Sequence, residues 1–107
     1  MRIRKSTYHD APFIKLLMQD LGIPTTVGLL VTQLNTLFMD GDHEVWVHDE
    51  KDMVTGFAIL HTLPRLGTDG NLMIVSCITG SEKSAKDALE RHIEGLAQKR
   101  NAERIKI

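Results

Sequence analysis

The segment from Thr79 to Lys86 has the residue types and spacing to bind an anion. It reads Thr-Gly-Ser-Glu-Lys-Ser-Ala-Lys and opens a long amphipathic helix, directly after an apolar run of strand length from Asn71 to Ile78. Helix starts present free backbone amides and the positive end of the helix dipole, which together favour a phosphate. Lysine side chains can add point charges to such a site. The segment is therefore a candidate phosphate-binding site.

The same segment also fits an ordinary capped helix start. Thr79 and Glu82 have the spacing of a capping box, in which each residue satisfies a free backbone amide of the other. Lys83 and Lys86 would then pair with acidic residues one helical turn away, as exposed helix residues often do. Phosphate binding and a solvated helix start both remain open on the sequence alone.

Ser76 and Cys77 are the candidate catalytic residues, because a hydroxyl and a thiol stand side by side shortly before this helix start. A reactive thiol needs a partner histidine or a helix dipole. A small buried hydrophobe is the usual role of a cysteine in an apolar strand. No sequence feature brings a base to either residue, and Ser84 has no local base either. These residues therefore also fit structural roles.

The densest group of metal-ligand residue types consists of Asp40, Asp42, His43, Glu44 and His48. Glu44 and His48 have the even spacing that places two residues on one side of a strand. The others belong to a polar turn, where acidic residues are common. No convergent spacing supports a metal ion, so we expect no metal site.

The elements that would position these residues follow from apolar periodicity and turn residues. The first half of the chain is expected to form a strand at 1–5, a helix from Thr7 to Gly22 and a helix from Thr26 to Gly41. Two strands follow, Glu44–His48 and Met53–Leu63, joined by a turn at 49–52. After a loop at 64–70, we expect strand Asn71–Ile78, a helix with its apolar face between Ala85 and Ala97, and a strand from Arg104 to Ile107. The expected fold is α/β (α+β), with the order β-α-α-β-β-β-α-β. Its mixed twisted sheet has two helices on one face and the long helix on the other, because a strand-helix-strand crossover is right-handed.

Length and composition indicate one domain over residues 1–107. The 13 basic and 14 acidic residues give a net charge of −1, so charge offers no argument for nucleic acid. No apolar run approaches the ~20 residues that a membrane span needs. The N-terminus lacks the apolar core of a signal peptide, and a single cysteine fits a reducing cytoplasm.

Several phrases of the chain, together with this order of elements, resemble the GNAT N-acetyltransferase family. The phrases are Arg2–Ile14, Leu16-Leu17, Leu21–Pro24, Val45–Glu50, Val54–Ala58 and Leu89–Ala97, of which Val54-x-Gly-Phe57 carries the most weight. The resemblance covers essentially the whole chain. It implies that the protein transfers acetyl from acetyl-CoA directly to an amine.

The resemblance also implies where acetyl-CoA would lie. Its pantetheine arm would pair with the backbone of the strand from Asn71 to Thr79, with an amide around Ser76 to Ile78 stabilising the oxyanion. Its pyrophosphate would lie on amides at the following helix start. The implied cofactor-binding residues are Cys77, Ile78, Thr79, Ser81, Lys83, Ser84, Ala85 and Lys86.

The chain departs from the family pattern at two places. Where the family's phosphate loop reads Gln/Arg-x-x-Gly-x-Gly/Ala, this chain has Ser81-Glu-Lys-Ser-Ala-Lys86 without either glycine. Family members also continue past the fifth strand into a helix that carries a tyrosine acid, whereas here Tyr8 is the only tyrosine. The implied domain is thus a truncated one with a degenerate phosphate loop.

No carboxylate lies between Asn71 and Thr79, where the family often has its base. Glu44, Asp49 and Asp69 are the nearest acidic alternatives on neighbouring elements, and the sequence singles out none of them.

A second hypothesis of a different class is a catalytically inactive GNAT-like protein that binds or regulates a partner. The last strand, Arg104 to Ile107, would be a sheet edge with unpaired backbone groups. A second copy could pair there across a two-fold axis, which predicts a homodimer. A third alternative is that the chain is a fragment of a longer product.

Overall fold

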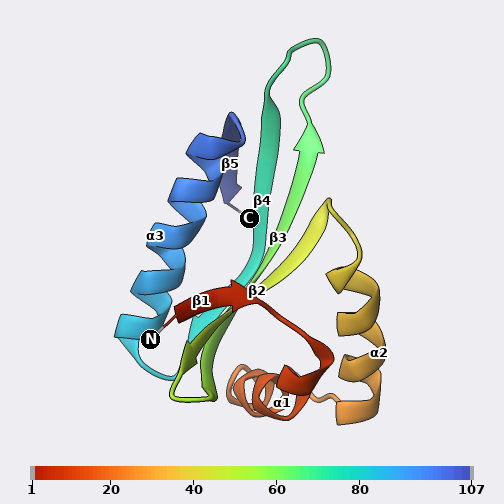
Figure 1. The fold of residues 1–107 in the computed structure, drawn as a ribbon, viewed down its shortest axis with the longest axis vertical. Coiled ribbons are helices and arrows are strands. Elements are labelled where there is room, and N and C mark those ends of the chain that lie inside the picture. The colour runs from red at the N-terminus through yellow and green to blue at the C-terminus, as the bar shows by residue number, and fades with distance from the viewer. Residues whose placement is uncertain (1, 107) are drawn as a thin grey trace.

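A five-stranded sheet in the order β1-β2-β3-β4-β5 forms the centre of the computed structural model, which describes residues 2–106 (Figure 1). The elements are β1 (Arg2–Lys5), the short 3-10 helix η1 (Tyr8–Asp10), α1 (Ala11–Asp20), α2 (Val27–Phe38), β2 (His43–Glu50), β3 (Met53–Pro64), β4 (Asn71–Gly80), α3 (Lys83–Lys99) and β5 (Ala102–Lys106). The expected order β-α-α-β-β-β-α-β is confirmed. Met1 and Ile107, at the ends of the predicted first and last strands, lie outside the described residues.

The first four strands pair antiparallel, and β5 pairs parallel to β4 across the crossover helix α3. Helices α1 and α2 cover one face of the sheet and α3 covers the other (Figure 1). The core on the first face centres on Phe57 and that on the second face on Leu60 and Leu89, which are fully buried. Helices on both faces were predicted from the sequence and are confirmed.

Local sequence explains where the helices start and stop. The hydroxyl of Thr26 accepts a hydrogen bond from the amide of Leu29 at 3.2 Å, which caps α2 as expected. Gly22 has a positive φ of 77° after α1, and the amide of Ile23 donates to the carbonyl of Met18 at 2.9 Å. This is the glycine-dependent end of a helix that the sequence predicts.

The turn between β2 and β3 is tighter than the predicted turn at 49–52. β2 runs to Glu50 and β3 begins at Met53, so only Lys51 and Asp52 form the connection. Both have positive φ, at 52° and 66°. A two-residue hairpin with two positive φ angles matches the twist of the flanking strands. The strands are therefore longer than the predicted Glu44–His48 and Met53–Leu63.

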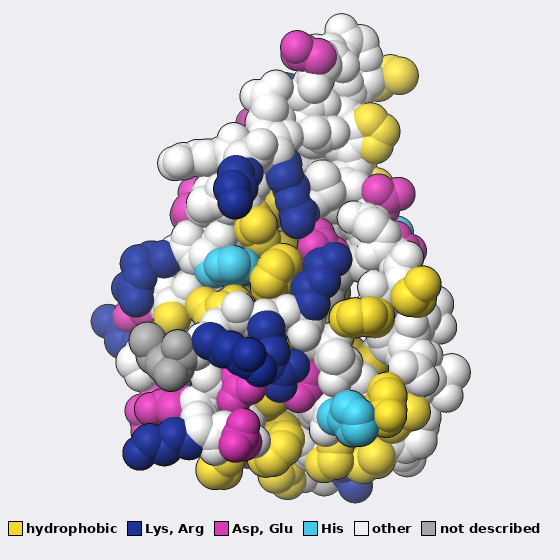
Figure 2. Space-filling view, viewed as in Figure 1, with side chains coloured by type: hydrophobic (Ala, Val, Ile, Leu, Met, Phe, Trp, Pro, Cys, Tyr) yellow, Lys and Arg dark blue, Asp and Glu magenta, His cyan; other side chains and the backbone are white. Residues whose placement is uncertain are grey.

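Lys and Arg side chains gather over β1 and the neighbouring part of α3, with acidic side chains beside them (Figure 2). Arg4 contacts two buried carboxylates: it donates to both oxygens of Asp10 at 2.9 and 2.8 Å, and its Nε donates to Asp49 at 3.0 Å. Burial would raise the pKa of Asp10, but hydrogen bonds from Arg4 and from the amide of Thr7 outweigh it and lower that pKa. Arg4 therefore neutralises two buried carboxylates, Asp10 and Asp49.

Within residues 2–106, none of the helices has the length and apolar character needed to cross a membrane.

Replacing Gly56 by alanine should destabilise the protein, because a Cβ there would lie 2.8 Å from the carbonyl oxygen of Thr79 on β4. Gly56 and Thr79 both lie on paired strands, so the backbone cannot move apart without disturbing the sheet. We expect Gly56→Ala to lower the free energy of unfolding by about 2 kcal/mol in urea titrations. Gly95→Ala is the matched control, since nothing lies within 4 Å of a Cβ there. In the middle of α3 it should raise stability by about 0.5–1 kcal/mol.

Candidate functional site

Strand β4 carries one extra residue relative to β3, and that residue is Ser76. Ile59 of β3 pairs with Cys77, and the next β3 residue, Leu60, pairs with Val75, so nothing on β3 stands opposite Ser76. Val75 packs with the core on the α3 face, whereas Cys77 packs with the core under α1 and α2. A bulge of this kind turns two consecutive side chains to the same side. Ser76 and Cys77 therefore both lie on the α1/α2 face.

The second neighbour of β4 is strand β5, which the structure describes as far as Lys106. The pairing of β4 with β5 ends at Val75 and Lys106. Over the part of the chain that the structure describes, Cys77 to Gly80 pair with β3 alone, and Ser76 has no partner on either side. Figure 1 shows β5 beside one end of β4, while α3 starts from the other end. Among the described residues, this half of β4 therefore has a strand on one side only, the arrangement that lets an extended ligand pair with a sheet.

The start of α3 is not capped as the sequence predicted. Thr79 lies in β4, paired with Phe57, and the residue at the cap position is Glu82, whose side chain makes no capping hydrogen bond. The predicted capping box of Thr79 and Glu82 is wrong, because the strand continues through Gly80. Among the described residues, no side chain therefore caps the first amides of α3.

Charge at the start of α3 favours an anion. Glu82 at the cap position is acidic, the first turn after it contains no acidic residue, and Lys83 and Lys86 follow in the first turns. Within residues 2–106, Lys83 and Lys86 make no ion pair, which leaves the predicted pairs with residues one turn away unformed. Gly80 packs tightly against this turn: a Cβ there would lie 3.0 Å from the amide nitrogen of Lys86. Strand end and helix start are thus in direct contact, with amides and two lysines together.

The structure places a histidine, His61, next to Ser76, whereas no feature of the sequence brings a base to this residue. The Oγ of Ser76 lies 2.8 Å from Nε2 of His61 on β3. Nδ1 of His61 lies 2.8 Å from Nδ1 of His43 on β2. The three side chains form one hydrogen-bonded row across three adjacent strands, on the face shared with Ser76.

The sequence could not assemble this row. His43 and His61 are cross-strand partners in the hairpin, a pairing that depends on the exact length of its turn. Ser76 reaches His61 only because of the bulge. His43 was noted as part of a possible metal group, and His61 was not singled out. The usable signal would have been alternation along the two hairpin strands, which places a histidine on the α1/α2 face of each.

Burial lowers the pKa of His61, and repulsion from His43 lowers it further. His61 is therefore largely neutral at physiological pH. Asp40, which follows α2, accepts hydrogen bonds from the amides of Asp42 and His43 at 2.7 and 3.2 Å, and these contacts lower its pKa. Its carboxylate thus lies near the far end of the row.

An apolar cavity of about 60 Å³ lies beside the row, between the sheet and the two helices. Val45 and Ile59 line it. Val45 lies two residues after His43 on β2, and Ile59 lies two residues before His61 on β3, each on the same face as its histidine. The remaining lining comes mainly from α1 and α2, with Leu30 and Leu34 among the buried residues. Cys77 packs partly against the same core, and burial raises the pKa of its thiol. Cys77 is therefore a neutral, partly buried group and is not part of the hydrogen-bonded row.

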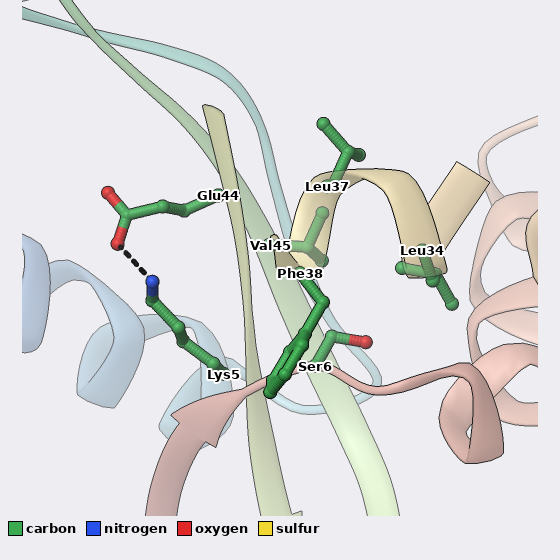
Figure 3. A pocket seen from close by; sticks show the side chains of 7 residues that line it. All are labelled: Lys5, Ser6, Leu34, Leu37, Phe38, Glu44 and Val45. Carbon is green, nitrogen blue, oxygen red and sulfur yellow. Dashed lines mark ion pairs between the residues drawn. The ribbon is translucent and has the colours of Figure 1, made fainter. Parts of the chain in front are cut away.

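Glu44 has a structural role, because its buried carboxylate is held by ion pairs. Arg100 donates to both its carboxylate oxygens at 2.5 and 3.0 Å, and Lys5 lies 3.4 Å away (Figure 3). Figure 3 also shows that Glu44 and Val45 point to opposite sides of β2, with Val45 towards α2. The hollow between β1, β2 and α2 measures only about 10 Å³, too small for a ligand. Burial would raise the pKa of Glu44, but the contacts with Arg100 and Lys5 lower it.

The other acidic candidates are also unsuited to act as a base at Ser76. Asp49 is buried and held by Arg4 at 3.0 Å. Asp69 lies exposed in the loop between β3 and β4, beyond the ends of the paired strands. Neither carboxylate contacts the row of His43, His61 and Ser76.

The remaining histidines have structural surroundings. His48 is buried, and its Nδ1 lies 2.7 Å from the hydroxyl of Thr55. The ring of His92 packs on Trp46 with centroids 4.5 Å apart. Among residues 2–106, no group of three or more His, Cys, Asp or Glu side chains is arranged to hold a metal ion.

Comparison with solved structures identifies the architecture. A GNAT family acetyltransferase from Staphylococcus aureus subsp. aureus USA300_TCH1516 superposes with a TM-score of 0.86, over 98% of this chain and 83% of that one. The sequence identity is 15%. The protein has the GNAT fold. This confirms the fold that the sequence resemblance implied.

Other proteins with the GNAT fold match equally well and carry different names. Glucosamine-6-phosphate N-acetyltransferase from Arabidopsis thaliana gives a TM-score of 0.82 at 13% identity, over 99% of this chain and 80% of that one. A transcriptional regulator from Bacillus halodurans C-125 gives 0.81 at 14% identity, over 98% and 79%. No protein-family model and no curated protein matches the sequence. The GNAT fold is therefore shown by structure.

Neutralising Glu44 should destabilise the protein, because it leaves Arg100 and Lys5 without their buried partner. We expect Glu44→Gln to lower the free energy of unfolding by about 2 kcal/mol at pH 7, less than a fully buried pair because Arg100 is partly exposed. The lowered pKa of Glu44 means that its contribution is present above about pH 4.3 and is lost as pH falls through the folded-state pKa. Urea titrations of both proteins from pH 7 to pH 3 should converge at the acid end.

Glu103→Gln is the control for that experiment. Glu103 also pairs with an arginine, Arg65, but both side chains are exposed. We expect a change within about 0.5 kcal/mol. An equal loss in both variants would show that the Glu44 pair has no special weight.

Proposed function

We propose that this protein transfers an acetyl group from acetyl-CoA to an amine, in the cytoplasm to which its single cysteine is suited. The observation that carries the proposal is the half of β4 from Cys77 to Gly80, paired on one side only among the described residues, which leads directly into the uncapped start of α3. The extended pantetheine arm can pair along this half of β4, and the pyrophosphate can lie on the amides at the start of α3. The GNAT fold supports this assignment, because its members include acetyltransferases.

The proposed binding residues fall into two groups along this path. Backbone groups of Cys77, Ile78 and Thr79 would pair with the pantetheine arm. The starts of the following turn and helix, Ser81 and Lys83 to Lys86, would hold the pyrophosphate through amides and the two lysine charges. The absence of the family's two loop glycines is partly offset by Gly80, which brings the strand into contact with the helix start.

The bulge supplies the electrostatic part of catalysis. A bulge disrupts the regular ladder, and Ser76 is the residue of β4 with no partner on β3 at that step. An amide aimed at a thioester carbonyl stabilises the negative charge that develops there, which is often the largest catalytic effect. The oxyanion donor is therefore proposed within Ser76 to Ile78.

Acetyl-CoA should stabilise the protein against heat. At a hundred times its dissociation constant a ligand adds about 2.7 kcal/mol of stability. For a domain of this size, that shifts the melting temperature by roughly 10 °C. Adenosine 3′,5′-bisphosphate, tested alongside at millimolar concentration, should give a smaller shift in the same direction. The absence of a shift with acetyl-CoA would contradict the proposal.

Reversing both lysine charges tests the phosphate site itself. Lys83→Glu with Lys86→Glu should abolish the acetyl-CoA shift while leaving the unliganded melting temperature equal or higher, because acids suit a helix start. The control, Lys15→Glu with Arg91→Glu, changes the net charge equally at positions away from the α3 start. It should retain the shift. Equal loss in both pairs would mean that binding depends on overall charge and that the α3 start is not the site.

A binding or regulatory role without catalysis is the second candidate function. It is favoured by the outer edge of β5, which pairs only with β4 within residues 2–106 and could accept a strand from a second copy. A protein named as a transcriptional regulator also has this fold. This candidate predicts a homodimer joined near Arg104 to Lys106, with no shift on adding acetyl-CoA. Light scattering at high concentration would show a monodisperse monomer if it is wrong.

A further inference from the structure

We propose that Ser76 and His61 take the proton from the acceptor amine during acetyl transfer, and that His43 positions His61 for this role. This inference rests on the proposed function and names the base for that reaction. Its basis is the hydrogen-bonded row of the three side chains across β2, β3 and β4. Glu44 and Asp49 are held in ion pairs with Arg100 and Arg4, and Asp69 lies in the exposed loop between β3 and β4.

Hydrogen-bond chemistry fixes one arrangement of protons that makes His61 a base. A neutral imidazole donates from one nitrogen and accepts at the other. If Nδ1 of His61 carries the proton, it donates to Nδ1 of His43, and Nε2 of His61 accepts from the Ser76 hydroxyl. His43 is then the acceptor that keeps His61 in this tautomer. The row has the order of nucleophile or relay, base and orienting group.

The position of Ser76 connects the row to the proposed thioester site. Ser76 is the bulge residue, so its hydroxyl and the backbone amides proposed for the oxyanion belong to the same step of β4. Its side chain is exposed, whereas His61 behind it is half-buried. Ser76 is therefore the more accessible of the two to an amine that approaches from solvent.

The chemical step balances without a further reactant. The amine nitrogen forms a bond to the thioester carbonyl carbon, and its proton moves to Oγ of Ser76 as the Ser76 proton moves to Nε2 of His61. The carbon–sulfur bond then breaks, and the sulfur leaves as a thiolate that takes a proton from the His61 imidazolium. The products are the N-acetyl amine and CoA, with Ser76 and His61 restored.

Acid should switch this step off, because a protonated His61 cannot accept. The groups that face His61 are His43 from β2 and Ser76 from β4, and Asp40 lies next to His43 at the end of α2. Burial and repulsion from His43 lower the pKa of His61. The group therefore stays active down to a pH below its ordinary value of about 6.5.

Acetyl transfer to n-butylamine is the test, measured by release of CoA thiol over a range of pH. A linear alkylamine is chosen because the adjoining cavity of about 60 Å³ is apolar. Ser76→Ala and His61→Gln should each lower kcat about 100-fold, the usual contribution of a positioned base, with the KM for acetyl-CoA unchanged. His9→Gln, an exposed histidine outside the row, is the control and should match the wild type.

The pH profile separates a base from a structural residue. Titration of the amine itself gives log(kcat/KM) a slope of about one, and the wild type should gain about one more unit of slope at acid pH from His61. His61→Gln should lose that extra slope. His43→Gln should move it to higher pH, because removing the neighbouring imidazole removes the repulsion that lowers the pKa of His61.

Several outcomes would overturn the inference while leaving the proposed function intact. Binding of acetyl-CoA by calorimetry tests the function separately, since none of these variants alters the α3 start. If acetyl-CoA binds but His61→Gln keeps the wild-type rate and slope, His61 is not the base. A Ser76 that gains the mass of one acetyl group would be a nucleophile. Nitrogen-15 NMR showing the His61 proton on Nε2 would exclude the relay whether or not transfer is detected.

Discussion

One extra residue in β4 determines most of what this fold can do. Ser76 breaks the regular pairing with β3, and the strand beyond it continues without β5 as a neighbour over the described residues. A sheet strand normally uses its backbone groups on both sides, so the interrupted ladder leaves polar groups free in an otherwise apolar element. The same interruption turns Ser76 and Cys77 to one face. The outward hydroxyl of Ser76 thus comes from the bulge, next to the last described pair of β4 with β5.

The ion pairs beside the sheet explain why histidine is left to act as the base. Glu44 joins β2 to Arg100 at the end of α3 and to Lys5 at the end of β1, and Asp49 is held by Arg4. A buried carboxylate without such partners would be strongly destabilising, so these acids cannot be both structural anchors and mobile proton acceptors. His61 differs in kind: it is neutral, half-buried and bonded only to a second imidazole and a hydroxyl.

The sequence predicted the architecture well because the architecture follows from local signals. Apolar spacing gave the helices, Thr26 and Gly22 marked two of their ends, and alternation gave the hairpin. The start of α3 was predicted less well. Thr79 has the residue type and spacing of a cap, but pairing with Phe57 keeps it in the strand, and tertiary pairing outweighs a local preference. The row of Ser76, His61 and His43 was out of reach, since it depends on the register of three strands and on a bulge that no local pattern announces.

The chemistry of the leaving group bears on how the departing sulfur obtains its proton. A thiolate has an ordinary pKa near 8.5, whereas an imidazolium has one near 6.5 and that of His61 is lower still. A proton taken from the amine by His61 therefore passes to the departing sulfur in a favourable direction. One histidine can serve as base for the attack and as acid for the departure, because the two events follow each other at the same carbon. The row on the α1/α2 face can in this way serve both proton transfers of the proposed reaction.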